Sequence, residues 1–151
     1  MARNMRYAVA VMLMMTSLLA FADNAILVRD AWVREAPPGA AVLAAYLTLE
    51  NTGTKEDKLV AVRCPDFDKI EIHATEIRAG VARMIALDAL PIPPQAVVKL
   101  APGGYHIMLH RPRRALAAGM SVKLELRFAS GPRLTVAAPV RHAESGATHH
   151  H

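Results

Sequence analysis

Residues 102–110, Pro102-Gly103-Gly104-Tyr105-His106-Ile107-Met108-Leu109-His110, carry the pattern that decides the fold. A Pro-Gly-Gly turn leads into six residues in which Tyr, Ile and Leu alternate with His, Met and His. This alternation is typical of a β-strand with one buried face. We expect Tyr105, Ile107 and Leu109 to face the core, and His106, Met108 and His110 to point together toward solvent or a rim. At a strand rise of about 3.3 Å per residue, His106 and Met108 lie close enough to reach one metal ion.

Short strand-like segments fill the chain between residues 23 and 141, and none of that region has helical periodicity. Gly, Pro and Asn separate the segments at spacings of roughly ten residues, which is typical of an antiparallel sandwich or barrel. The predicted fold is therefore all-β, with strands at 26–33, 42–50, 58–64, 70–75, 81–87, 96–100, 105–110, 122–128 and 134–140.

The first 22 residues have the pattern of a secretory signal peptide. Arg3 and Arg6 precede an apolar run that ends in Ala20-Phe21-Ala22, and the run is shorter than the roughly twenty residues that span a bilayer. We expect cleavage after Ala22, with Ala25 as second choice, and an exported protein without stable membrane insertion. The expected organisation is a signal peptide at 1–22, a single β-domain at 23–141 and a flexible His-containing tail at 142–151.

Without the signal peptide the chain has a mild excess of positive charge, because sixteen of its 18 Lys and Arg residues remain against 13 Asp and Glu. The most basic stretch, at Arg111, Arg113 and Arg114, has no interleaved aromatic residue, so nucleic-acid binding is not expected. The stretch fits a solvated turn, with docking of an acidic partner protein as the alternative. Cys64 is the only cysteine, and we expect a buried structural thiol rather than a soft ligand or a redox group.

Two histidines and two methionines form a candidate metal site, namely His73, Met84, His106 and Met108. Imidazole nitrogens and neutral thioether sulfurs make a soft donor set, which suits Cu(I) and is poorly suited to Zn²⁺, Ca²⁺ or Mg²⁺. Between residues 23 and 141 the chain has only one other methionine, Met120, and one other histidine, His110. This concentration indicates a function for the four residues.

Two of the four donors lie on segments that a tight turn joins. The core face of 70–75 holds two isoleucines, so His73 is expected on the outer face. A hairpin whose turn is centred between Arg78 and Ala79 places His73 directly opposite Met84. A slip of one residue would send one donor to the opposite face.

The spacing of these residues resembles the signature of the periplasmic copper chaperone family called PCu(A)C: His73, ten residues, Met84, twenty-one residues, and then His106-x-Met108. The similarity covers roughly residues 26–141 and is most evident at 26–32, 37–39, 46–53, 70–73 and 102–109. It implies a cupredoxin-like, antiparallel Greek-key β-sandwich in the periplasm that binds one Cu(I) through these four residues at an exposed site. Many relatives have Met at the position of His110 and a further Met soon after His73, where this chain has Ala74-Thr75-Glu76.

The resemblance also implies a metallochaperone that carries copper toward the Cu(A) centre of cytochrome c oxidase. Its implied partners are copper donors or acceptors, such as the Cu(A) domain of oxidase subunit II or a Sco-type assembly factor. Copper sequestration without a dedicated recipient is the alternative, followed by a structural β-sandwich that binds no metal. The sequence has no nucleophile beside a general base and no phosphate-binding loop before a helix, so we do not expect an enzyme.

Further histidines are candidates for auxiliary metal binding. His110 shares the outer face with His106 and Met108, but fits a solvent-exposed rim residue better than a ligand. The tail histidines can form a loose second site for Cu(II), which accepts imidazole, unless the last three are a cloning remnant. These tail residues are His142, His149, His150 and His151.

Overall fold

The computed structural model describes residues 25–142, and ten β-strands account for most of them. The strands are β1 (Ile26–Arg34), β2 (Val42–Asn51), β3 (Asp57–Arg63), β4 (Phe67–Arg78), β5 (Val81–Leu87), β6 (Leu90–Ile92), β7 (Ala96–Leu100), β8 (His106–Pro112), β9 (Ser121–Phe128) and β10 (Arg133–Arg141). Over residues 25–142 there is no helix, and hence none long and apolar enough to cross a membrane. The expected signal peptide and all of the tail after His142 lie outside the described residues, so the domain limits stay a prediction.

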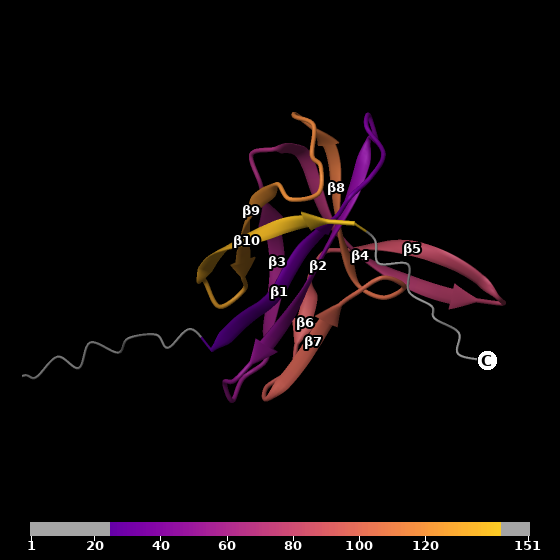
Figure 1. Ribbon diagram of the computed structural model, residues 1–151. Helices are drawn as coiled ribbons and strands as arrows, with labels where there is room; N and C mark the ends of the chain where they lie inside the picture. Colours follow the sequence, from indigo (N-terminus) through magenta and orange to yellow (C-terminus); the bar gives the residue numbers. More distant parts are fainter. Residues whose placement is uncertain (1–24, 143–151) are drawn as a thin grey trace, which may run out of the picture.

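The strands form two layers that are joined through one pair of strands (Figure 1). The first layer has the order β5-β4-β8-β2-β1, with β7 also paired to β2, and the second has the order β10-β9-β3-β6. The junction is β1 with β10, which run parallel, whereas the other strand pairs of the described chain are antiparallel. The predicted all-β sandwich is confirmed, with this parallel junction as an added feature.

Apolar side chains from both layers fill the space between them. Alternation directs Ile107 and Leu109 of β8 and Leu124 and Leu126 of β9 into this core, and all four are 0% exposed. Burying each such side chain stabilises the fold by about 1.5–3 kcal/mol. Tyr105 was also expected there but is 39% exposed, because it precedes β8 and belongs to the turn that its carbonyl closes with the Ala101 amide.

The strand positions agree with the sequence pattern where alternation is clear and differ where it is not. Strands β5 and β7 have the predicted limits, whereas β4 begins at Phe67, three residues before the predicted start. Strand β6 was missed, because Pro91 lies within it and reads as a turn residue. Proline is tolerated there because β6 pairs only with β3 and is the edge of the second layer.

The β4–β5 hairpin has a register different from the predicted one. Its loop residues are Ala79 and Gly80, with positive φ angles of 51° and 77°, as a type I′ turn requires. The centre of the turn is therefore one residue later than predicted, and the residue opposite Met84 is Thr75 rather than His73. The partner moves by two residues, which is an even number, so Met84 stays on the same face as His73.

Candidate metal centre

Strands β4 and β8 bring two histidines together. His73 of β4 pairs directly with His106 of β8, and their ring centroids are 5.7 Å apart with an interplanar angle of 76°. The sequence pattern had placed both on outer faces but did not relate them, because β4 and β8 are not joined by a hairpin. This histidine pair is the centre of the candidate site.

The two methionines flank the histidine pair on the same face of the sheet. Met108 is two residues further along β8, opposite Glu71, and Met84 lies on β5 opposite Thr75. Diagonal neighbours on adjacent strands are about 7–8 Å apart, which long side chains can bridge. The structure therefore brings the four predicted donors to one face of three adjacent strands, although the direct pairing of His73 with Met84 was wrong.

Exposure differs strongly among the donors. Met84 is 63% exposed, whereas His106 is only 4% exposed, so the prediction that His106 points toward solvent was wrong. The pairing of Ala45 with Ile107 places the next residue of β2, the buried Tyr46, beside His106. The site is thus closed toward β2 and open toward β5.

A backbone carbonyl fixes the protonation of His106. Its Nδ1 is 3.0 Å from the carbonyl oxygen of Gly104, and because a carbonyl only accepts, Nδ1 carries the proton and Nε2 keeps its lone pair. His106 Nε2 and His73 Nδ1 are buried and have no hydrogen-bond partner in residues 25–142. Buried polar atoms without a partner are unusual in folded proteins, and here they supply two nitrogens that can bind a metal ion.

Glu71 brings a negative charge next to the histidines. Its Oε1 is 2.8 Å from Lys69 Nζ, and its Oε2 is 3.0 Å from His110 Nε2 and 3.7 Å from His73 Nε2. The Lys69 hydrogen bond holds the pKa of Glu71 below its ordinary value, so the carboxyl is ionised at neutral pH. Burial lowers the pKa of His73 despite the nearby carboxylate, which keeps this imidazole neutral and able to bind a metal.

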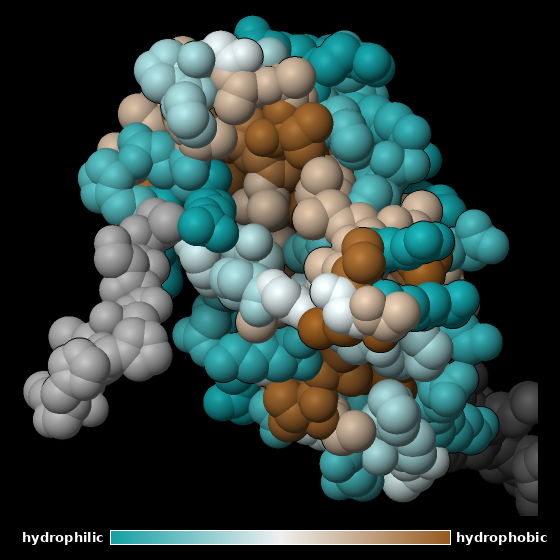
Figure 2. Space-filling view, turned by 90° about the vertical axis from the view of Figure 1, so that its right-hand side faces the viewer, coloured by the Kyte–Doolittle hydropathy of each residue, from teal (hydrophilic) through white to brown (hydrophobic). Residues whose placement is uncertain are grey.

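Methionine sulfurs accompany the histidines on this face. Among the described residues, no group of three or more His, Cys, Asp and Glu side chains is placed to hold a metal ion. Figure 2 faces the side from which the β4–β5 hairpin projects and shows hydrophobic residues reaching the surface between hydrophilic ones. The exposed apolar residues of this hairpin are Ile77, Val81 and Met84. The two thioethers on this face are soft donors of the kind that suits Cu(I).

The auxiliary histidines fall into three groups. His110 lies two residues beyond Met108 on β8 and is partly buried against Glu71, so it is less exposed than the predicted rim residue. His142 is exposed and contacts the carboxylate of Glu35, which follows β1 and lies outside β4, β5 and β8. His149, His150 and His151 are outside the described residues, so the Cu(II) site in the tail stays a prediction.

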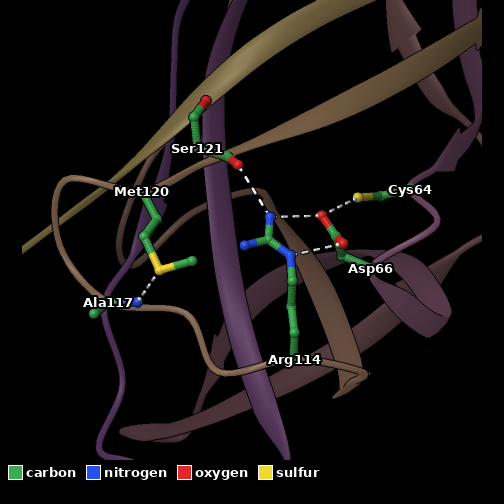
Figure 3. Close-up of polar contacts among 6 residues, drawn as sticks. All are labelled: Cys64, Asp66, Arg114, Ala117, Met120 and Ser121. Carbon is green, nitrogen blue, oxygen red and sulfur yellow. Dashed lines mark hydrogen bonds and ion pairs between the residues drawn. The ribbon is translucent and has the colours of Figure 1, made fainter.

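The arginines that follow Met108 do not form a free basic patch. Arg111 and Arg113 both donate to Asp68, at 3.0 and 2.8 Å. Arg114 donates to both oxygens of Asp66, at 2.9 and 3.0 Å (Figure 3). These carboxylates neutralise much of the charge, which disfavours the alternative that this stretch docks an acidic partner.

Cys64 lies next to the Asp66–Arg114 pair and is 6% exposed (Figure 3). Its Sγ is 3.9 Å from an Asp66 oxygen. Burial raises the pKa of the Cys64 thiol, which keeps it protonated and weakly nucleophilic. The predicted burial of the Cys64 thiol is confirmed, and its structural role stays a prediction.

We expect Asp66→Asn to lower the thermal unfolding midpoint at pH 7, by an amount that shrinks as the pH falls below 3.8. The hydrogen bonds from Arg114 hold the pKa of Asp66 below its ordinary value of 3.8. The ion pair therefore stabilises the fold above pH 3.8, and this contribution is lost as the pH falls through the lower native pKa. Asp88→Asn, at an exposed residue with no ion pair among the described residues, should leave the midpoint unchanged at each pH. A midpoint difference between wild type and Asp66→Asn that does not shrink as the pH is lowered would contradict this assignment.

Comparison with known proteins gives the family. A family model described as "Putative lipoprotein LpqE-like" matches residues 26–140. The chain belongs to the LpqE-like family. A "Putative lipoprotein" of Leifsonia xyli subsp. xyli is 33% identical to the LpqE-like chain over 119 residues, which cover 78% of this chain and 70% of that protein. An "Uncharacterized protein" of Rickettsia prowazekii is 36% identical over 86 residues, covering 56% of this chain and 48% of that protein.

Solved structures similar to the LpqE-like chain include proteins with bound copper. The copper-bound PCuAC domain from PmoF2 has 25% identity and a TM-score of 0.68, with 79% of this chain and 94% of that domain covered. A Cu(I)-bound protein of Deinococcus radiodurans, solved in solution, has 31% identity and a TM-score of 0.68, with 85% of each chain covered. The cupredoxin-like fold is thereby confirmed, and the resemblance to PCu(A)C proteins is supported alongside the lipoprotein name of the family.

Proposed function

We propose that the LpqE-like chain carries one Cu(I) ion bound by His73, Met84, His106 and Met108. The observation that carries the proposal is the placement of two neutral imidazoles and two thioethers on one face of β4, β5 and β8. Four neutral donors hold Cu(I) without neutralising its charge, and Glu71 provides a compensating carboxylate nearby. The copper-bound structures similar to this chain support the same conclusion.

The uneven exposure of the donors suits a carrier. Met84 is on an edge strand and 63% exposed, so its thioether is the ligand that an incoming partner displaces first. His106 is buried and held by Gly104, so it keeps the ion bound while the other ligands exchange. Copper is therefore the cargo of this protein, and a carrier of this kind requires no catalytic residue.

We propose that the protein acts in the periplasm and passes copper toward the Cu(A) centre of cytochrome c oxidase. The receiving partner is the Cu(A) domain of subunit II or a Sco-type assembly factor. The lipoprotein description of the family supports export from the cytoplasm. Sequestration is the alternative function of the same site, and it differs in having no recipient.

The test combines binding with transfer. Under anaerobic, reducing conditions we expect the full chain to bind one equivalent of Cu(I), and to lose it to an apo Cu(A) domain, measured as copper that elutes with that domain after the two proteins are separated. Binding of one equivalent without transfer to the Cu(A) domain or to a Sco-type factor would favour sequestration. Absence of stoichiometric Cu(I) binding would contradict both functions. A matched sample of apo chain with the Cu(A) domain controls for copper from other sources.

A further inference from the structure

The outer face of the second layer is strongly basic. Alternation along β9 buries Leu124 and Leu126 and turns the residues between them outward. The exposed cations of β3, β9 and β10 include Arg63, Lys123, Arg127 and Arg133. None of them belongs to the 111–114 stretch that the sequence pattern had singled out.

The pairing of the strands sets like charges against each other on this face. Arg127 lies directly opposite Arg133, an arrangement that destabilises a sheet. Glu125 is the carboxylate within the group; it lies directly opposite Arg63 and is 3.9 Å from Arg133. Within residues 25–142, Arg63, Lys123 and Arg127 form no ion pair. One carboxylate within the group thus leaves most of this positive charge uncompensated.

A hollow of about 650 Å³ adjoins the basic face, between β3, β9, β10 and the start of β4. Its charged lining consists of five cations and two carboxylates: Arg63, Lys69, Arg113, Lys123 and Arg133 with Asp68 and Glu125. Asp68 is already hydrogen-bonded to Arg111 and Arg113. Glu125 is therefore the remaining carboxylate of the lining, beside Arg63, Lys69, Lys123 and Arg133. We call this hollow, together with Arg127 beside it, the basic hollow.

We infer that the basic hollow docks an acidic segment on the surface of a partner protein. A small anion is disfavoured because the Glu125 carboxylate lies among the cations, whereas an acidic surface can contact the cations around it. A lipid surface is disfavoured because none of the exposed large apolar residues of the described chain lines the hollow. Single-stranded nucleic acid is disfavoured because Phe67, the aromatic residue in the lining, is only 4% exposed and offers no stacking platform.

The basic hollow also has a defined position relative to the candidate metal centre. It extends to Lys69, whose Nζ binds Glu71, and Glu71 lies opposite Met108. A partner docked in the hollow is therefore held next to the outer face of β4. Charge complementarity of this kind accelerates and orients association. Docking does not depend on metal binding and is tested without it.

The probe is a synthetic ten-residue peptide of alternating Glu and Ser, titrated into the isotope-labelled, metal-free full chain. We expect backbone amide shifts to concentrate at 63, 69, 123–127 and 133. Raising the salt from 20 to 200 mM should weaken binding several-fold, because exposed charges are screened. The matched peptide of alternating Gln and Ser should not bind. Equal binding of both peptides, or shifts spread over the whole surface, would overturn the inference.

Charge reversal gives the sharper comparison. Lys123→Glu with Arg127→Glu should weaken peptide binding by about tenfold or more, since two attractions become repulsions. This variant should fold, because Glu at position 127 faces Arg133 and replaces a like-charge pair by an opposite pair. Lys55→Glu with Lys99→Glu makes the same change in net charge at exposed residues elsewhere and should alter binding by less than about twofold. Equal weakening by both double variants would overturn the inference, as would binding to phosphatidylglycerol vesicles without binding to the acidic peptide.

Discussion

Replacing Met84 and Met108 together by alanine should abolish stoichiometric Cu(I) binding while leaving the fold intact. The two thioethers supply half of the proposed donors, and among the described residues no group of three or more His, Cys, Asp and Glu side chains is placed to substitute for them. Each single change should weaken Cu(I) binding by more than about a hundredfold, because the loss of residues that only orient a ligand already costs 10–100-fold. Anaerobic competition with a Cu(I) chelator measures both the stoichiometry and the affinity.

Met120→Ala is the matched control for the two methionine changes. Met120 is 36% exposed and lies in the turn before β9, where its sulfur accepts a hydrogen bond from the Ala117 amide. Its replacement should leave Cu(I) affinity within about twofold of wild type, since effects of distant sites are independent. Unchanged stoichiometry in the Met84→Ala, Met108→Ala double variant would refute the assignment of the site.

The face on which each donor lies was predictable from the sequence, because local alternation determines it. His73 and Met84 share a face whether the hairpin turn is centred before or after Ala79, since the two registers differ by an even number of residues. Their direct pairing was not predictable with the same security. A type I′ turn needs positive φ angles at both loop residues, and glycine adopts such angles most easily. The observed turn therefore has Gly80 as its second loop residue, whereas the predicted turn had Arg78 and Ala79 in the loop.

The burial of His106 depends on contacts with distant parts of the chain, which the local sequence pattern does not show. His106 alternates with apolar residues and so has the pattern of an outward residue, yet it is 4% exposed. Its burial follows from the Gly104 carbonyl on one side and from β2, which brings Tyr46 beside it. In the same way, Asp66 and Asp68 neutralise arginines that lie more than forty residues later in the chain. Local patterns therefore located the donors, while tertiary pairing determined their exposure and the distribution of free charge.

Replacing Ile107 by alanine should cost the fold about 2–5 kcal/mol, the range for removing a fully buried isoleucine side chain. Ile107 is 0% exposed and lies between Ile72 of β4 and Ala45 of β2 in the first layer. Its side chain points into the core while those of its neighbours His106 and Met108 lie on the opposite face. The change removes no copper donor, so the variant should still bind one equivalent of Cu(I). Because the ion binds only the folded chain, adding Cu(I) should raise the unfolding midpoint of the variant.

Ile77→Ala makes the same chemical change at a position that is 76% exposed. It should alter the free energy of unfolding by less than about 0.5 kcal/mol, because no cavity forms at an exposed residue. Ile107→Val, which removes a single methylene, should fall between the two at about 0.5–1.5 kcal/mol. Urea denaturation of the metal-free variants measures all three values. If Ile107→Ala were no more destabilising than Ile77→Ala, the packing of β8 into the core would be wrong, and so would the placement of His106 and Met108 on the outer face.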